Sequence, residues 1–188
     1  MVRFLNKNLK QQYKVWKNFK ELKSTKNIDL EPGLTTYSKS GYLLVVQYLV
    51  DNGANIHFAE NYAIQLAAHN GHLPIVKYLV NPPVNPADLK SALFNTIGIE
   101  RSSRRDDLVS KGSNINALNK ALFSATNKGH LNIVQYLVSK GANIHADNDR
   151  ALGYAADKGH LPIVLYLLSL GANTDSLTAE QKAEFNIN

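Results

Sequence analysis

Apolar residues along this chain recur in one ten-residue arrangement. The four copies begin at Gly41, Gly71, Gly129 and Gly159, and they read GYLLVVQYLV, GHLPIVKYLV, GHLNIVQYLV and GHLPIVLYLL. The steps between successive copies are 30, 58 and 30 residues. Spacings of three and four within each copy predict a helix that buries one face. A phrase repeated at a fixed period predicts structural units copied in tandem, each contacting mainly its neighbours.

Two further segments accompany the apolar phrase. A stretch of small residues precedes it in LAAHNGH (66–72), SATNKGH (124–130) and YAADKGH (154–160). These stretches predict a short first helix whose small side chains allow neighbouring helices to approach closely. Gly53, Gly112, Gly141 and Gly171 follow the apolar phrase, where a left-handed residue would end the second helix.

Together these segments resemble the ankyrin repeat, over about residues 33–175. The resemblance implies an all-α ankyrin-repeat solenoid of about five helix-turn-helix units with terminal capping helices. It also implies a protein that binds other proteins. The units are expected at about 31–58, 59–85, 86–116, 117–146 and 147–175, within an array over 31–177, with a cap or tail at 178–188.

The chain departs from the family pattern in its period and in its first-helix motif. The usual period is about 33 residues, whereas the regular step here is 30. The family's Thr-Pro-Leu-His box is absent, and Asn61-Tyr62-Ala63-Ile64 is one of the segments in its place. We therefore expect a shortened hairpin and no Thr–His hydrogen-bond set between neighbouring units. The shortened form resembles arrays of giant DNA viruses that infect amoebae.

The third unit is degenerate. When Gly112 is aligned with Gly141, charged residues fall where the next unit has Ile133, Val134 and Tyr136; they are Arg104, Arg105 and Asp107. Because burying unpaired charges costs several kcal/mol each, we expect this helix to turn them to water. The segment 87–98 is apolar enough for a helix. The array is then expected to divide at this unit, with weak coupling across it.

The net charge of +6 belongs to the first 30 residues, which hold eight basic and two acidic residues. Leu9, Tyr13, Trp16 and Phe19 predict an amphipathic helix over 7–23. This helix could cap the first repeat, or residues 1–26 could form an arm that binds acidic lipid or nucleic acid. A leader without fixed structure is a third reading. The candidate anion-binding residues are Lys7, Lys10, Lys14 and Lys17.

The remaining composition narrows the class of protein. The chain has no cysteine, no apolar run near the ~18 residues that span a bilayer, and no apolar segment of a secretory signal. We expect a protein that is neither secreted nor transmembrane, cytoplasmic or nuclear in location, and in the host cytosol if viral. We also expect a monomer.

Candidate catalytic and metal-binding chemistry is sparse. His72, His130 and His160 recur once per unit, so they are expected one repeat apart, each hydrogen-bonded to nearby backbone. No HExxH spacing, nucleophile elbow or glycine-rich phosphate loop occurs. We therefore expect no enzyme activity, no cofactor and no metal.

The ankyrin resemblance places partner contacts on hairpins and on the exposed ends of first helices. In this sequence these positions are Lys39, Ser40, Asn61, His69, Asn70, Asn119, Asn127, Lys128, Asn148, Asp149, Asp157 and Lys158. Three functions remain open: a scaffold that binds a protein partner, a peripheral binder acting through the basic leader, and a decayed array without a specific role.

Overall fold

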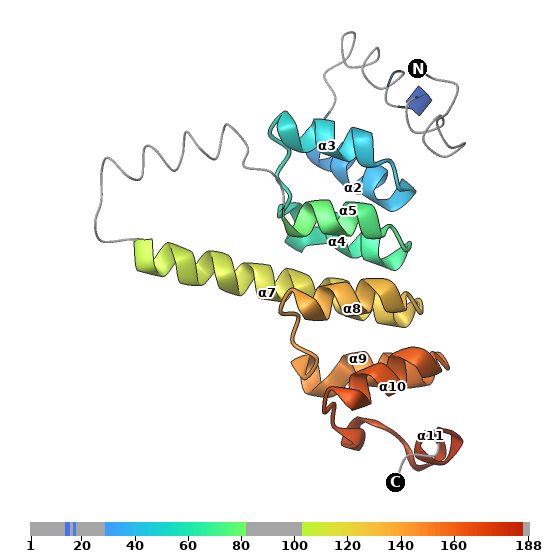
Figure 1. The fold of residues 1–188 in the computed structure, drawn as a ribbon. Coiled ribbons are helices and arrows are strands. Elements are labelled where there is room, and N and C mark those ends of the chain that lie inside the picture. Colours follow the sequence, from blue (N-terminus) through green and yellow to red (C-terminus); the bar gives the residue numbers. More distant parts are fainter. Residues whose placement is uncertain (1–13, 16, 18–28, 82–102, 186–188) are drawn as a thin grey trace.

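A computed structural model describes residues 14–15, 17, 29–81 and 103–185. Its elements form helix pairs that succeed one another along the chain (Figure 1). The helices are α2 (Leu30–Ser40), α3 (Leu43–Asp51), α4 (Phe58–His69), α5 (Leu73–Val80), α7 (Ser103–Asn127), α8 (Leu131–Ser139), α9 (Ala146–Asp157), α10 (Leu161–Ser169) and α11 (Ala179–Glu184), with a 3₁₀ turn η2 at Thr174–Ser176. The described part of the chain contains no strand. The all-α solenoid expected from the repeats is therefore confirmed.

The turn between the two helices of a pair follows from the Gly-His sequence. In α4–α5, Gly71 has φ +78°, a conformation that glycine adopts without steric cost. The N–H of His72 then donates to the carbonyl of Ala67 over 2.9 Å, which closes the end of α4. Pro74 lies in the first turn of α5, where a missing N–H leaves no helical hydrogen bond unmade.

The turn that precedes the first helix of a pair is short, and its backbone is left-handed in α4 and α9. Ala59, Glu60 and Asn61 have φ between 48° and 65°, and residues 147–149 between 51° and 60°. Three consecutive left-handed residues cost roughly 1–2 kcal/mol each for side chains other than glycine. A histidine stabilises each turn: His57 Nδ1 lies 2.6 Å from Asn61 Oδ1, and His145 Nδ1 lies 2.8 Å from Asp149 Oδ1. This turn is the form that the shortened hairpin takes.

One continuous apolar core runs through the described array, from Leu34 on α2 to Leu177 before α11. The second helices contribute large side chains such as Leu49, Leu137 and Leu167, each with no exposed surface. The first helices contribute small ones such as Ala67, Ala125 and Ala155, also fully buried. Small side chains let the first helices lie close together, as the sequence predicted.

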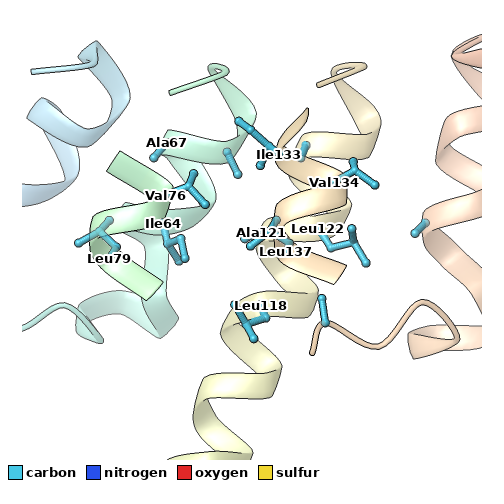
Figure 2. Packing of buried hydrophobic residues seen from close by; sticks show 14 of the residues in the cluster. Ile64, Ala67, Val76, Leu79, Leu118, Ala121, Leu122, Ile133, Val134 and Leu137 are labelled. Carbon is cyan, nitrogen blue, oxygen red and sulfur yellow. The ribbon is translucent and has the colours of Figure 1, made fainter. Parts of the chain in front are cut away.

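The array does not divide at the third unit, and that expectation was wrong. Helix α4 packs directly against α7, and α5 packs against α8. Figure 2 shows buried residues of the two pairs side by side, among them Ile64 and Val76 of α4–α5 and Ala121 and Ile133 of α7–α8. No layer intervenes between α4–α5 and α7–α8. The described array therefore contains four stacked helix pairs. The second of them, α4–α5, contacts α7–α8, which the sequence analysis counted as the fourth unit.

Helix α7 explains how the chain passes the degenerate unit. It runs without interruption from Ser103 to Asn127, so Gly112 lies inside a helix instead of ending one. The expected boundary between residues 116 and 117 also falls within α7 and not in a hairpin. The N-terminal half of α7 extends beyond the stack (Figure 1). The helix expected over 87–98 lies outside the described residues.

The physical reason is the loss of the apolar stripe in the third unit. A layer carrying Arg104, Arg105 and Asp107 at stacking positions would place charges between two apolar faces. Direct contact of the flanking pairs instead buries both faces, which is favourable by roughly 25 cal/mol per Å² of apolar area. The charged residues predicted that the third unit would not stack in the regular way. The pairs on either side of it contact each other directly.

The two ends of the chain differ in how much the structure describes. Lys14, Val15 and Lys17 are helical, and Val15 packs against the core, the kind of contact that a capping helix makes. Most of the leader, including Lys7 and Lys10, lies outside the described residues. At the other end, Thr178 Oγ1 accepts from the N–H of Gln181, and Gln181 Oε1 accepts from the N–H of Thr178. This capping box begins α11, as its sequence predicted.

The assignment of faces predicts which substitutions destabilise the protein. Leu137→Ala and Ile163→Ala remove fully buried side chains, so each should lower the free energy of unfolding by about 2–5 kcal/mol. Lys158→Ala changes an exposed residue and should stay within about 0.5 kcal/mol. Urea unfolding measures both, and equal losses for the two classes would show that the faces are misassigned.

The direct contact of α4–α5 with α7–α8 predicts that the segment between them is dispensable for folding. Deleting residues 83–110 should leave a monomeric, cooperatively unfolding protein, because every repeat interface described here is retained. Circular dichroism and a thermal melt measure this. Loss of cooperative unfolding in the deletion variant, with a conservative variant such as Lys158→Ala melting normally, would contradict the direct stacking.

Candidate functional site

The candidate site lies on the exposed side of the first helices α2, α4, α7 and α9. We call it the first-helix face. Its residues occupy positions that recur at the repeat step, so each helix contributes side chains to the same rows. They are Thr35, Thr36 and Lys39 on α2; Tyr62, Gln65, Leu66 and His69 on α4; Lys120, Phe123, Ser124 and Asn127 on α7; and Arg150, Tyr154 and Asp157 on α9.

A groove of about 440 Å³ crosses this face between α4, α7 and α9. Tyr62, Lys120 and Arg150 line one end, and His69 and Asn127 line the other. A second hollow of about 410 Å³ lies between α2 and α4 and shares Tyr62 with the first. The face is therefore hollowed along most of the stack.

Aromatic rings and an arginine form the floor of the groove. The rings of Phe123 and Tyr154 meet edge to face with centroids 6.4 Å apart. The Arg150 guanidinium lies 5.6 Å from the centroid of Phe123 and 5.1 Å from that of Tyr154. Its Nε donates to the Tyr154 hydroxyl over 2.9 Å, and its Nη1 donates to Asp147 over 3.3 Å. Aromatic and arginine side chains are those most enriched at binding hot spots.

Charge on the face is unevenly compensated. Lys120 forms an ion pair with Glu60 of the neighbouring repeat, and this lysine lowers the pKa of the Glu60 carboxyl. At the other end of the groove, burial lowers the pKa of His69, and the nearby side chains of Lys128, His130 and Lys39 lower it further. Basic side chains therefore surround His69 at this end of the groove.

The turn histidine of one repeat hydrogen-bonds to the end of the first helix of the preceding repeat. His72 Nε2 donates to the carbonyl of Lys39 over 2.9 Å, His130 Nε2 to that of His69 over 3.1 Å, and His160 Nε2 to that of Asn127 over 3.3 Å. Because a carbonyl only accepts, Nε2 carries the proton in all three rings. The sequence predicted backbone partners for these histidines, but not that each partner lies in the preceding repeat.

The separations of these bonds measure the interruption in the stack. Donor and acceptor are 33 residues apart for His72 and for His160, but 61 apart for His130. The difference is 28 residues, close to one repeat. The same inter-repeat contact therefore forms across the inserted segment as within the regular part of the array.

The turn glycines make room for these rings. A Cβ placed on Gly41, Gly71 or Gly129 would lie 2.7, 2.9 or 2.8 Å from Cε1 of the histidine that follows in the stack. Real Cβ contacts are essentially never that short. Gly159 has the same left-handed backbone, and nothing lies within 4 Å of its added Cβ. The first three glycines are therefore needed for both backbone conformation and space.

Two predicted contact residues instead belong to the structure's internal bonding. Asp149 is buried, with 6% of its surface exposed, and its Oδ1 accepts from His145 and from the N–H of Asn173. Its assignment to partner binding was wrong, because no partner can reach it. Asn119 is partly buried, and its Oδ1 accepts from the N–H of Asn143 over 2.7 Å. Both side chains join successive repeats.

The other predicted positions lie at the surface. Lys39, Ser40, Asn70, Lys128, Asn148, Asp157 and Lys158 are exposed, and Asn61, His69 and Asn127 are partly buried. Some of these side chains form hydrogen bonds within their own helix: Ser40 donates to the carbonyl of Thr36, and Asn70 donates to that of Leu66. Asp157 accepts from Gln181 of α11 over 2.8 Å. The groove itself brings together His69 and Asn127.

Sequence reasoning missed the floor of the groove. Tyr62 and Arg150 directly follow the selected Asn61 and Asp149, whereas Phe123 and Tyr154 lie about one turn before the selected Asn127 and Asp157. The signal was present, because these positions recur at the repeat step with a different side chain each time. Comparing repeats row by row would have found them.

In residues 14–15, 17, 29–81 and 103–185, no group of three or more His, Cys, Asp or Glu residues is arranged to hold a metal ion. In the described residues no helix combines the length and the apolar character needed to cross a bilayer.

The histidine–glycine contact makes a paired prediction. Gly159→Ala should cost roughly 1–2 kcal/mol of stability, because alanine is strained in the left-handed region. Gly71→Ala should cost about 1 kcal/mol more, because the Cβ also displaces His130 and weakens its hydrogen bond. Urea unfolding of both variants tests this, and equal losses would show that the ring does not occupy that space.

Comparison with known proteins gives two matches to family profiles. The profile described as "Ankyrin repeats (many copies)" matches residues 34–80, and the one described as "Ankyrin repeats (3 copies)" matches residues 105–178. The second match begins inside α7. The two matches lie on either side of residues 81–104, between the directly stacked pairs α4–α5 and α7–α8.

Three curated relatives share this repeat. Ankyrin repeat protein L66 of Acanthamoeba polyphaga mimivirus is 31% identical over 59% of this chain and 14% of its own length. Ankyrin repeat protein L72 of the same virus is 30% identical over 54% of this chain and 29% of its own. The ankyrin repeat and KH domain-containing protein mask-1 of Caenorhabditis elegans is 28% identical over 60% and 4%. The chain thus spans less than a third of each relative.

The stacked helix pairs, the Gly-His turns and the two profile matches lead to one conclusion. This chain belongs to the ankyrin-repeat family and resembles the ankyrin arrays of an amoebal giant virus.

Proposed function

We propose that this protein is a non-enzymatic scaffold that binds a partner protein on its first-helix face. The supporting observation is a contrast between rows of residues. Buried rows repeat almost unchanged, as in Ala67, Ala125 and Ala155. The exposed row that lines the groove changes from Tyr62 to Lys120 to Arg150. A scaffold that binds a specific partner requires a core that is the same in every repeat and a surface that differs between repeats.

The groove supplies the means of binding. It offers aromatic and cationic side chains on a rigid floor of helices, and rigid anchors lower the entropic cost of association. The viral relatives lead us to propose that the protein acts in the cytosol or nucleus of an amoebal host cell, as a monomer.

Two other functions compete with this one. The net charge of +6 supports a leader that binds acidic lipid or nucleic acid through Lys7, Lys10, Lys14 and Lys17. A decayed array is the remaining alternative. The core that continues past the degenerate unit supports a retained structure instead, because the same histidine contact forms before, across and after the inserted segment.

Site-directed photocrosslinking can locate the binding surface. A photoreactive amino acid is placed at Ser124 or Gln65 on the first-helix face, and at Gln135 or Asn132 on the outer side of α8 as matched controls. After irradiation in amoebal extract, the first-helix positions should give discrete crosslinked bands that mass spectrometry identifies as the same protein. The outer positions should not.

Two results would contradict the proposal. Equal crosslinking from both surfaces would show that the first-helix face is not selective. Binding would be assigned to the leader if the crosslinks disappear in both of two conditions. In the first, Lys7, Lys10, Lys14 and Lys17 are replaced by glutamine, and in the second, the extract is treated with nuclease.

A further inference from the structure

Three lysines lie at the turn end of the first-helix face. Lys39, Lys128 and Lys158 are exposed, and none of them takes part in an ion pair with another described residue. The cations at the opposite end of the groove are neutralised, Lys120 by Glu60 and Arg150 by Asp147. Among the described residues, the turn end therefore carries three unpaired lysines and one carboxylate, that of Asp157, which accepts from Gln181.

This asymmetry is not a consequence of the overall charge. Beyond residue 30 the chain holds thirteen basic and thirteen acidic residues, so the array as a whole is neutral. A neutral array that collects unpaired lysines on one edge of its groove is electrostatically complementary to an acidic surface.

The turn edge also adjoins a contact site that is not charged. His69 lies near Lys39 and Lys128, and burial together with these cations lowers its pKa, which favours the neutral ring. Phe123 and Tyr154 lie behind it on the groove floor, next to Gly153, where nothing lies within 4 Å of an added Cβ. An apolar side chain can enter this open space while neighbouring carboxylates meet the lysines.

From these contacts we infer that the partner presents an acidic, extended segment, which crosses the repeats along the Gly-His turns and inserts one apolar side chain beside Phe123. This inference rests on the proposed function and specifies its partner. Neighbouring helices pack about 8–10 Å apart, and an extended chain advances about 3.3 Å per residue. Carboxylates that meet Lys128 and Lys158, one repeat apart, should therefore be about three residues apart.

Selection from a random peptide library tests the inference. Twelve-residue peptides displayed on phage are selected on the full chain in which all eight basic residues of the first 30 are replaced by glutamine, so that the leader does not collect acidic peptides. The selected sequences should be enriched in Asp or Glu about three residues apart, next to an apolar residue.

Matched charge variants then measure where the peptide binds. Fluorescence anisotropy of a selected peptide should show affinity falling about five- to tenfold in Lys128→Gln/Lys158→Gln, since two exposed ion pairs are lost. The control Lys77→Gln/Lys140→Gln removes the same charge from exposed residues of the second-helix side. It should change affinity less than about twofold, because charges beyond a Debye length of ~10 Å are screened.

The outcomes separate this inference from the proposed function. Peptides without acidic enrichment that still crosslink to Ser124 would overturn the acidic partner and leave the first-helix face as the binding surface. Equal losses of affinity in the two double variants would also overturn it. A selection that yields no peptide crosslinking to Ser124 would count against the proposed function itself.

Discussion

A histidine ring lying over the turn glycine of the preceding repeat is the contact on which this array depends. The ring donates from Nε2 to a carbonyl at the end of the preceding first helix, at 2.9, 3.1 and 3.3 Å in the three instances. It occupies the space that a glycine Cβ would fill. This contact fixes the spacing of the first helices, and hence the arrangement of the side chains that line the groove. It substitutes for the Thr–His set that the family's usual motif would supply.

The same contact explains how the array tolerates a damaged repeat. Since each unit interacts mainly with its neighbours, a unit that loses its apolar stripe would normally break the stack. Here His130 instead reaches His69 across 28 additional residues, and α4 and α5 meet α7 and α8 directly (Figure 2). The first-helix face stays continuous because the pairs on either side of the degenerate unit contact each other directly.

The sequence predicted much of this fold, and its failures have physical causes. Repeated apolar phrases predicted the second helices, and Gly-His predicted the turns, because both depend on residues close in sequence. The step of 58 residues between Gly71 and Gly129 suggested two stacked units, yet period alone cannot say whether a unit lies inside the stack. Left-handed backbone at Ala59–Asn61 escaped prediction because no glycine marks it.

The candidate site was predicted only in part, for a similar reason. The family resemblance directed attention to the turn ends, where Lys39, His69 and Lys128 indeed meet at one edge of the groove. Phe123 and Arg150 gain their role from rings and charges on different repeats, which no local pattern reveals. Asp149 looked like a surface carboxylate, and only the packing of the next repeat buries it.

The direct stacking across the inserted segment is tested most simply by nuclear magnetic resonance. A nuclear Overhauser effect between the Hε1 proton of His130 and the Hα protons of Gly71 is expected, because the ring's Cε1 lies 2.9 Å from the position of a Cβ on that glycine. In an uninterrupted five-unit array, His130 would instead contact the residues aligned with its own turn in the third unit, near Glu100. An effect from His130 to residues 99–101, with none to Gly71, would contradict the account.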